Sequence, residues 1–361
     1  MVTISPRSRL PGRFALRPAL IKVVMLCVAA LTAACASSPD TVRLTKSRFS
    51  LPIGTYVSPV TGERYELLYS DDFATDPFSR TPWKSGWIDD PVRRAELLAG
   101  EHNVWTAYDG GPSTAHIDNS WWLAKNITHS PGVMRLGSSW DPQANAAQRY
   151  PGQVGRLTTS GFSASRFAHE VKYGRWDAVW RMDTSAEVMY AIMLYGDSGA
   201  YWPLYVEMDI AEGNGDGING SFYSTLHYEP TDDDSGHGKK QLTDEVAVEG
   251  TMAVWHRLSV DFSPGRLDYF LNGKRVVSAV AAGAVGVPES GDCSQLMRTG
   301  SLPDNICYVP DEAIPDSLTY RGRDLGPRTF IFQTEAAADA GPNTPTPTAE
   351  IDWVAIYRMM E

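Results

Sequence analysis

Three carboxylates fall within six residues of an otherwise apolar, strand-like stretch near the middle of the chain. Glu207, Asp209 and Glu212 lie in the segment 202–212, and the hydrophobic residues Val206, Met208 and Ile210 alternate with the first two acids. Alternation of period two is typical of a half-buried strand with hydrocarbon on one face and acid on the other. Like charges so close repel one another, which destabilises a sheet unless a reaction uses them. Cleavage of a glycosidic bond is such a reaction, because one carboxylate attacks the sugar while a second, protonated carboxyl releases the leaving group.

The spacing of the acids predicts an irregularity in this strand. Glu207 and Asp209 share a face, but Glu212 comes five residues after Glu207 and would point to the other face of a regular strand. One extra residue, a β-bulge around Ile210-Ala211, would return Glu212 to the acidic face. The two Glu side chains could then lean together over Asp209, to the separation of about 5–5.5 Å found in retaining glycosidases. The alternative is a solvated strand face whose acids do nothing; the aromatic residues on both sides favour the chemistry.

A turn-rich β fold is needed to position such a strand. Short apolar-alternating runs recur between turn residues, as in 175–182, whereas helical periodicity is scarce. Asn272-Gly273 lies between two such runs and predicts a hairpin with a type I′ turn. The chain has 31 Gly, 24 Pro and 43% hydrophobic residues, and we find no internal repeat. These features predict an all-β fold, a sandwich of two antiparallel sheets.

Composition limits the classes of partner. The net charge of −11 argues against nucleic acid, whose phosphates require basic patches. Eleven Trp and sixteen Tyr suit a carbohydrate ligand, because flat aromatic rings stack on the apolar faces of sugars. The sequence contains no His-Glu-x-x-His arrangement, no Gly-x-Ser-x-Gly elbow and no phosphate-binding loop. We therefore expect a polysaccharide or oligosaccharide partner and no cofactor for catalysis.

The N-terminal region is typical of a targeting segment. Basic residues between positions 7 and 22 precede an apolar run over 23–34, which is too short to span a bilayer. Cleavage after Ala36 would release a secreted protein. Cleavage before Cys35 would give a lipoprotein, although Thr32 suits that signal poorly. Either way we expect export, either to the cell envelope or to the medium, with membrane attachment only through a lipid at Cys35.

The domain organisation follows from this segment. We expect a signal peptide over residues 1–36, a polar tether over 37–60 and one catalytic domain over 61–361. Outside the targeting segment only Cys293 and Cys307 remain, on either side of an insertion rich in Pro, Gly and Ser. In an oxidising compartment a disulfide between them would stabilise this loop by about 3 kcal/mol. Two free thiols are the alternative.

Several segments resemble glycoside hydrolase family 16 in the same order. The signature of that family reads Glu-x-Asp-x-x-Glu, which matches 207–212. The further matching segments are Thr159-Ser160-Gly161, Tyr173-Gly174-Arg175-Trp176-Asp177, Trp202-Pro203, Thr225-Leu226-His227-Tyr228, Trp255-His256-Arg257, Asn272-Gly273-Lys274 and Ile351-Asp352-Trp353-Val354-Ala355-Ile356-Tyr357. The resemblance covers residues 61–361. It implies a concanavalin A-like β-jelly-roll of two curved antiparallel sheets, with the substrate cleft on the concave face.

The resemblance also assigns roles to the acids. Glu207 corresponds to the nucleophile, Glu212 to the general acid/base and Asp209 to the assisting acid, while His227 lies near the catalytic centre of such enzymes. Two departures leave the substrate open: 189–193 lacks the two Trp of many members, and 335–337 replaces paired glycines.

The activity implied is that of an endo-acting retaining β-glycosidase, with a β-1,3- or mixed β-1,3/1,4-glucan as first substrate. A β-galactan hydrolase, an envelope transglycosylase and a non-catalytic carbohydrate-binding protein of the same fold are the alternatives.

Further residues are candidates for binding. Trp202 precedes the acidic strand, Trp105 and Tyr108 lie in an aromatic-rich loop region, Asn126 resembles an early cleft Asn of the family, and Tyr228 follows His227. Core packing is the alternative for any of these aromatic residues. Members of the family often carry a structural calcium on the convex face near the closing strand, which makes Asp352 a candidate ligand.

Overall fold

The computed structural model describes most of the region after residue 46. By internal contacts the chain divides into two units, residues 1–45 and 46–361, and all described residues belong to the second. The described ranges are 47–52, 54–74, 105–108, 111–112, 121–145, 154–164, 171–182, 188–196, 207–213, 221–228, 240–247, 251–281, 306–309, 319–320, 323–324, 328–336, 340–346 and 348–361. Within these ranges no helix is long and apolar enough to cross a membrane.

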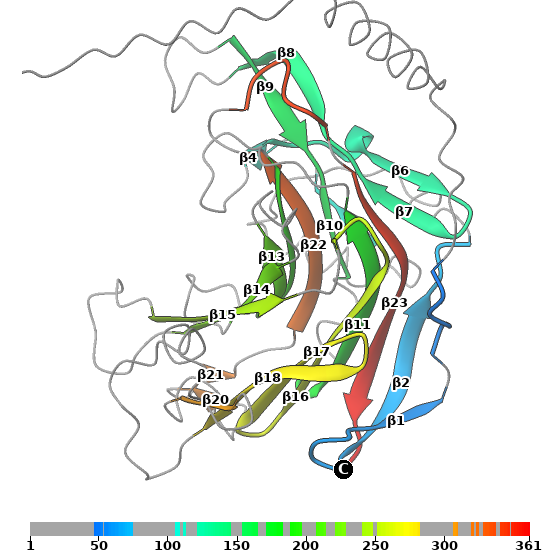
Figure 1. Ribbon diagram of the computed structural model, residues 1–361, viewed down its shortest axis with the longest axis vertical. Helices are drawn as coiled ribbons and strands as arrows, with labels where there is room; N and C mark the ends of the chain where they lie inside the picture. The colour runs from blue at the N-terminus through cyan, green and yellow to red at the C-terminus, as the bar shows by residue number, and fades with distance from the viewer. Residues whose placement is uncertain are drawn as a thin grey trace, which may run out of the picture. The chain divides into compact units, whose positions relative to one another are not determined.

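Two large sheets make up the domain, and in both the strands bend along their length (Figure 1). The first sheet has ten strands. In spatial order they are β1 (Thr55–Val57), β2 (Arg64–Asp71), β23 (Ala349–Met359), β11 (Gly174–Met182), β16 (His256–Ser263), β17 (Arg266–Leu271), β18 (Lys274–Ala281) and β19 (Ile306–Val309), with β7 (Val133–Leu136) on β23 and β6 (Ile127–Ser130) on β7.

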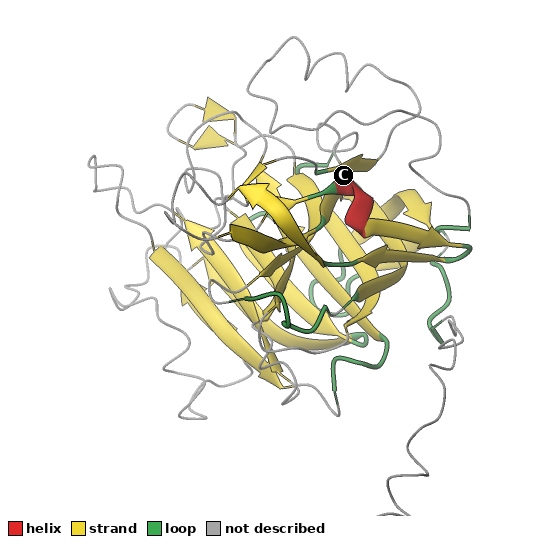
Figure 2. Ribbon diagram, turned by 90° about the horizontal axis from the view of Figure 1, so that it is seen from above, coloured by secondary structure: helices red, strands yellow, loops and turns green. Residues whose placement is uncertain are grey.

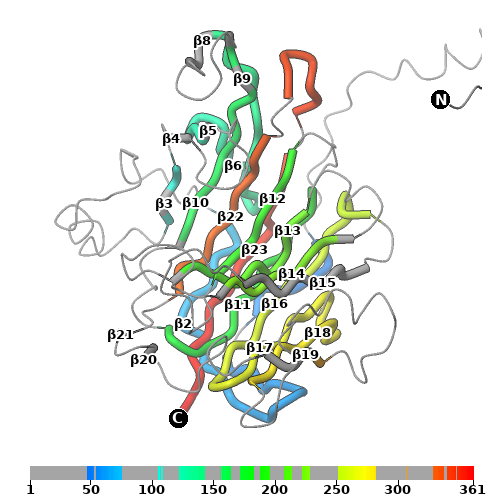
Figure 3. The backbone as a smooth tube through the Cα atoms, turned by 90° about the vertical axis from the view of Figure 1, so that its left-hand side faces the viewer, coloured from blue at the N-terminus to red at the C-terminus, as the bar shows by residue number. Residues whose placement is uncertain are grey.

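The second sheet has seven strands and carries the acidic segment. In spatial order they are β15 (Lys240–Ala247), β14 (Ser221–Tyr228), β13 (Glu207–Gly213), β12 (Val188–Gly196), β22 (Arg328–Ala336), β10 (Gly161–Ala164) and β3 (Trp105–Ala107). Figure 3 shows β22, β12, β13 and β14 side by side. Within this sheet all pairings are antiparallel.

Smaller elements complete the described part of the chain. They are the four-stranded sheet β4 (Gly111–Pro112), β5 (Trp121–Trp122), β9 (Val154–Thr159) and β8 (Ser139–Asn145), the pair β20 (Thr319–Tyr320) and β21 (Arg323–Asp324), and the 3-10 helix η1 (Ala124–Asn126). Strands dominate the view from above, where η1 is the helix drawn (Figure 2). The predicted all-β sandwich of antiparallel sheets is confirmed.

The main core is built from alternate residues of strands in both sheets. On β11 the alternation places Trp176, Ala178 and Trp180 in this core, as the pattern of 175–182 predicts. Aromatic rings contribute much of it: Phe162 stacks on Phe332 with ring centroids 5.1 Å apart. Full burial of one such side chain stabilises the fold by about 1.5–3 kcal/mol, so the core holds both sheets in place.

The predicted hairpin is confirmed. Leu271 pairs with Lys274, so Asn272 and Gly273 form a two-residue connection between β17 and β18. Both connecting residues have positive φ, 54° and 82°, as a type I′ turn requires.

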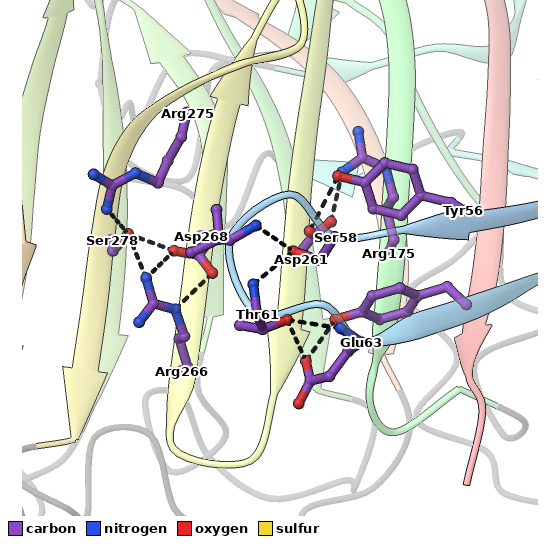
Figure 4. A network of polar contacts seen from close by, with 12 residues as sticks. Tyr56, Ser58, Thr61, Glu63, Arg175, Asp261, Arg266, Asp268, Arg275 and Ser278 are labelled. Carbon is purple, nitrogen blue, oxygen red and sulfur yellow. Dashed lines mark hydrogen bonds and ion pairs between the residues drawn. The ribbon is translucent and has the colours of Figure 1, made fainter.

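The first sheet carries a buried ionic network, of which Figure 4 labels Arg175, Asp261 and the neighbouring Tyr56. Arg175 lies between Asp177 and Asp261, at 2.7 and 2.5 Å, and Asp177 also accepts from Arg257 at 2.5 Å. The Tyr56 ring covers the guanidinium of Arg175, 3.9 Å from its centroid. Three of these charges are shielded from water, which makes the network costly to break.

The described residues 47–52 and 54–60 belong to the folded domain, so the predicted tether over 37–60 is too long. The Trp353 indole donates to the Phe49 carbonyl at 3.0 Å, and β1 pairs with β2. Phe49 and Leu51 also pack against a buried cluster of the first sheet. Apolar side chains at these two positions explain why the chain docks here. Residues 1–36 lie outside the described residues, so export and the lipid at Cys35 stay predictions.

Candidate active site

Strand β13 presents its acids on the face opposite the core. Met208, Ile210 and Ala211 are buried in the main core, whereas Glu207 and Glu212 are half-buried. Hydrophobic residues at 208 and 210 anchor the strand from below. The acids are therefore carried on a rigid element whose other side is held by packing.

The predicted β-bulge is confirmed by the register on both sides of β13. Against β14, Asp209 pairs with Thr225 and Glu212 with Tyr223, so three steps on β13 match two on β14. Against β12, the pairs are Asp209 with Met193 and Ala211 with Ile192, which again leaves one extra residue. Because Ile210 and Ala211 both point into the core, the alternation shifts by one and Glu212 joins the acidic face.

Asp209 and His227 form a buried pair between the two long acids. The distance from His227 Nε2 to Asp209 Oδ2 is 2.9 Å, and the residues are only 4% and 1% exposed. His227 also lies directly opposite Glu207 in the β13–β14 register. Donor atoms of Glu207, Asp209 and His227 all lie within 4.8 Å of one another. A carboxylate fixed in this way is positioned to hydrogen-bond with its neighbours rather than to rotate freely.

Within the described ranges, the side-chain oxygens and ring nitrogen of Glu207, Asp209 and His227 lie close enough together to hold a metal ion. Asp352 lies in β23 of the first sheet, where its Oδ2 accepts from the Ser47 amide at 3.2 Å and from the Ser47 hydroxyl. The structural calcium at Asp352 stays a prediction.

The charges of the two glutamates affect the pKa values of two tyrosines on β12. Burial, and after it the charge of Glu207, together raise the pKa of Tyr195 to about 12. Burial also raises the pKa of Tyr190, with the charge of Glu212 as the second cause. Both phenols therefore stay neutral over the whole working range of an enzyme. Sequence reasoning missed both, although the alternation along 188–195 could have placed them beside the acidic strand.

An apolar cluster adjoins the acids on the same face of the second sheet. Ala191 pairs with Glu212 and Met193 with Asp209, and Ile331 lies beside Met193 on β22. Ala191, Met193 and Ile331 pack together, with Tyr108 and Tyr195 against them. The floor next to the acids is thus made of small and flexible apolar side chains, where the resemblance leads one to expect Trp.

Polar residues continue this face on β22. Gln333 lies opposite Ala191, and its Nε2 donates to Glu335 Oε1 at 2.7 Å. Sequence reasoning noted Glu335 only as a departure from the family pattern and missed Gln333. Ala191 pairs with Gln333 on one side and with Glu212 on the other, so Gln333 lies two strands from Glu212. This strand register cannot be read from the sequence alone.

Two predicted binding residues have structural roles instead. Trp105 is 2% exposed and packs against Phe162 in the main core, with ring centroids 5.1 Å apart. Its Nε1 donates to Asp71 Oδ2 at 2.9 Å. Because strand β3 pairs with β10 and buries this ring, no face is left for a sugar, and the predicted stacking role is wrong.

Asn126 is likewise committed to internal bonds. Its Nδ2 donates to Thr158 Oγ1 and to the Thr159 carbonyl, both at 2.9 Å, and its Oδ1 accepts from Ser139 at 2.7 Å. These bonds tie η1 to β9 and β8. The cleft role predicted for Asn126 is therefore replaced by a structural one.

The other predicted residues are placed in part or not at all. Tyr108 is half-buried against the apolar cluster, and its ring lies over Gly161, where an added Cβ would meet it at 2.7 Å. Tyr228 ends β14, but its side chain lies outside the described residues, as does the side chain of Cys307. Trp202 and Cys293 fall wholly outside them. The stacking and disulfide predictions for these residues stay predictions.

Comparison with known proteins relates this geometry to solved structures. No protein-family model and no curated sequence matches the chain. A structure from work on endo-acting O-glycanases that human gut microbiota express to initiate mucin breakdown is 15% identical, with 86% of this chain and 95% of that chain covered and a TM-score of 0.56. The endo-β-1,3-glucanase from Pyrococcus furiosus is 13% identical, with 86% and 100% covered and a TM-score of 0.51.

A third similar structure is a non-specific endo-β-1,3(4)-glucanase from family GH16, which holds a 1,3-β-D-cellobiosyl-glucose at its active site. It is 12% identical, the match covers 87% of this chain and 100% of that chain, and the TM-score is 0.53. Likeness at this level of identity shows the fold. The chain has the jelly-roll fold of these glucanases, and the resemblance to glycoside hydrolase family 16 that the ordered motifs indicate is confirmed at that level.

Proposed function

We propose that this protein is an endo-acting retaining β-glycosidase that hydrolyses a polysaccharide, with a β-1,3- or mixed β-1,3/1,4-glucan as substrate. The observation that carries the proposal is the bulge in β13, which brings Glu212 to the face that holds Glu207 and the Asp209–His227 pair. Two carboxylates on one face of a curved sheet suit double displacement, and the shared fold of known glucanases supports the class of substrate.

The proposed first step forms a glycosyl-enzyme. The Glu207 carboxylate attacks the anomeric carbon, the bond from that carbon to the leaving oxygen breaks, and Glu212 gives its proton to that oxygen. Glu212 must therefore be protonated when the sugar binds, and the like charge of Glu207 on the same face of β13 favours that state.

The second step restores the enzyme. Glu212, now ionised, removes a proton from water, and the hydroxide so formed displaces Glu207 from the anomeric carbon. Asp209, fixed by His227, adjoins Glu207 and assists as the charge of the nucleophile changes. Retention of configuration follows from the two inversions.

A digestion panel tests the proposal. Laminarin, lichenan, agarose and carrageenan are incubated with the wild type and with Glu207→Gln, and reducing ends are measured. Release from laminarin or lichenan by the wild type, abolished in the variant, is the expected result. Release that survives Glu207→Gln would remove this mechanism. No release from any of the four would favour a carbohydrate-binding protein. Mass spectrometry of the products separates hydrolysis from transglycosylation, which would yield oligosaccharides longer than the donor.

A further inference from the structure

The bulge in β13 leaves one residue outside the register of both neighbouring strands. Ile210 has no partner residue on β12 or on β14. A backbone carbonyl so placed in the core needs another donor, because a buried carbonyl without a hydrogen bond is costly. Ser224 on β14 supplies it: its hydroxyl donates to the Ile210 carbonyl at 2.9 Å, and the side chain is buried.

The other flank of the bulge is closed by an aromatic ring. Tyr190 on β12 lies opposite Gly213, the residue that follows Glu212. A Cβ at Gly213 would lie 2.5 Å from the Tyr190 oxygen and 2.6 Å from the ring carbon that bears it, closer than real Cβ atoms come. The ring cannot easily retreat, because Trp180 packs against it with centroids 4.3 Å apart.

We propose that Ser224 and Tyr190 are positioning residues that fix the β13 bulge from its two flanks and so hold Glu212 where it protonates the leaving group. Ser224 holds the bulge through the Ile210 carbonyl. Tyr190 fills the space beneath Gly213, which must therefore stay a glycine. Neither side chain touches the substrate, since both are on the core side of the sheet. The inference rests on the proposed function, because it assigns Glu212 the role of acid.

The proposal makes a chemical prediction that a merely structural role does not. A shift of the bulge moves Glu212 more than Glu207, which precedes it on the strand. The rate should then fall for substrates whose leaving group needs a proton, whereas dinitrophenolate leaves without one and its release should be little affected. A displacement of about 1 Å at a catalytic group can cost about 100-fold.

The test compares kcat/KM on two substrates, because this ratio reports the first chemical step. One is the polysaccharide that the wild type degrades, and the other is the 2,4-dinitrophenyl β-glycoside of its disaccharide. Ser224→Ala and Gly213→Ala should each lose about 10- to 100-fold on the polysaccharide and less than about threefold on the dinitrophenyl glycoside. Adding Tyr190→Leu to Gly213→Ala makes room for the new methyl group and should restore at least part of the loss.

Matched controls come from the first sheet. Ser278→Ala removes a buried serine hydroxyl that donates to Asp268, and Gly174→Ala places a methyl group against the Tyr357 carbonyl. Both should destabilise the protein, yet leave kcat/KM per folded molecule within about twofold on both substrates, because both lie in the first sheet, whereas β13 belongs to the second.

The outcomes separate the two proposals. An active wild type whose Ser224→Ala and Gly213→Ala variants lose equally on both substrates, or no more than the controls, overturns the positioning role and leaves the glycosidase intact. A wild type inactive on every polysaccharide overturns the proposed function. In that case urea unfolding still decides whether Gly213 and Tyr190 are coupled, since additive effects in the double variant would refute the contact.

Discussion

Replacement of Arg175 by Met should weaken the domain in a manner that depends on pH. Arg175 is the cation between two buried carboxylates, 2.7 Å from Asp177 and 2.5 Å from Asp261. Met has a similar length but no charge. Asp177 keeps Arg257 at 2.5 Å, so the carboxylate left without its ion-pair partner is that of Asp261.

The magnitude follows from burial. Removal of one partner from a buried ion pair costs about 3–5 kcal/mol of unfolding free energy when the other stays charged. Burial raises the pKa of Asp261 from 3.8 to about 6, with Arg175 acting against that rise. Without Arg175 the folded-state pKa rises further, so at pH 5 Asp261 is protonated in both proteins. At pH 8 the charge must be buried, and each additional unit of pKa adds about 1.4 kcal/mol to the loss.

Urea unfolding at pH 5 and pH 8 measures the effect, with tryptophan fluorescence as the signal, since Trp176 and Trp180 are among the residues that become exposed on unfolding. Arg358→Met is the matched control, because its partner Glu66 and Arg358 itself have side chains 39% and 50% exposed, and the expected loss is below about 1 kcal/mol. A loss below about 1 kcal/mol for Arg175→Met at pH 8, or a loss at pH 5 as large as that at pH 8, would refute the reasoning.

Three further variants give distinct results. Asp261→Asn removes a carboxyl whose raised pKa makes wild-type stability fall as pH rises from 4 to 7. Urea titrations should show the wild type losing about 2 kcal/mol relative to the variant over that range, and a constant difference would contradict this. His227→Ala frees Asp209 and should lower kcat about 100-fold in steady-state assays while KM changes little; a rise in KM alone would make His227 a binding residue. Trp105→Ala should cost about 3–5 kcal/mol in thermal or urea unfolding yet leave KM unchanged, whereas a raised KM in a stable variant would restore the sugar-stacking role.

The bulge was predictable because it depends only on the spacing of residues along one strand. Spacing along one strand fixes which side chains share a face, so the five-residue interval from Glu207 to Glu212 already requires an extra residue. The Asp209–His227 pair was harder to foresee from the residues alone. It depends on the register between β13 and β14, which places His227 opposite Glu207.

Depth below the surface was the other property that local patterns did not give. An aromatic residue in a loop-rich region can stack on a sugar or fill a core, and only the pairing of β3 with β10 decides this for Trp105. Phe49 and Leu51 are the sequence feature that indicates docking of the chain before residue 52, since a polar tether does not need apolar side chains. Ser224 and Tyr190 belong to the core side of their strands, where sequence patterns identify packing rather than a role at the site.

Azide rescue of two variants tests the central claim, the pairing of Glu207 and Glu212 across the bulge, most directly. Glu212→Ala and Glu207→Ala are each assayed on the dinitrophenyl β-glycoside with sodium azide, and the anomeric configuration of the glycosyl azide is read by proton NMR. We predict the β-azide from Glu212→Ala, because azide attacks the glycosyl-enzyme on Glu207, and the α-azide from Glu207→Ala, because azide then replaces the nucleophile. Failure of azide to accelerate either variant, or the same anomer from both, would contradict the claim.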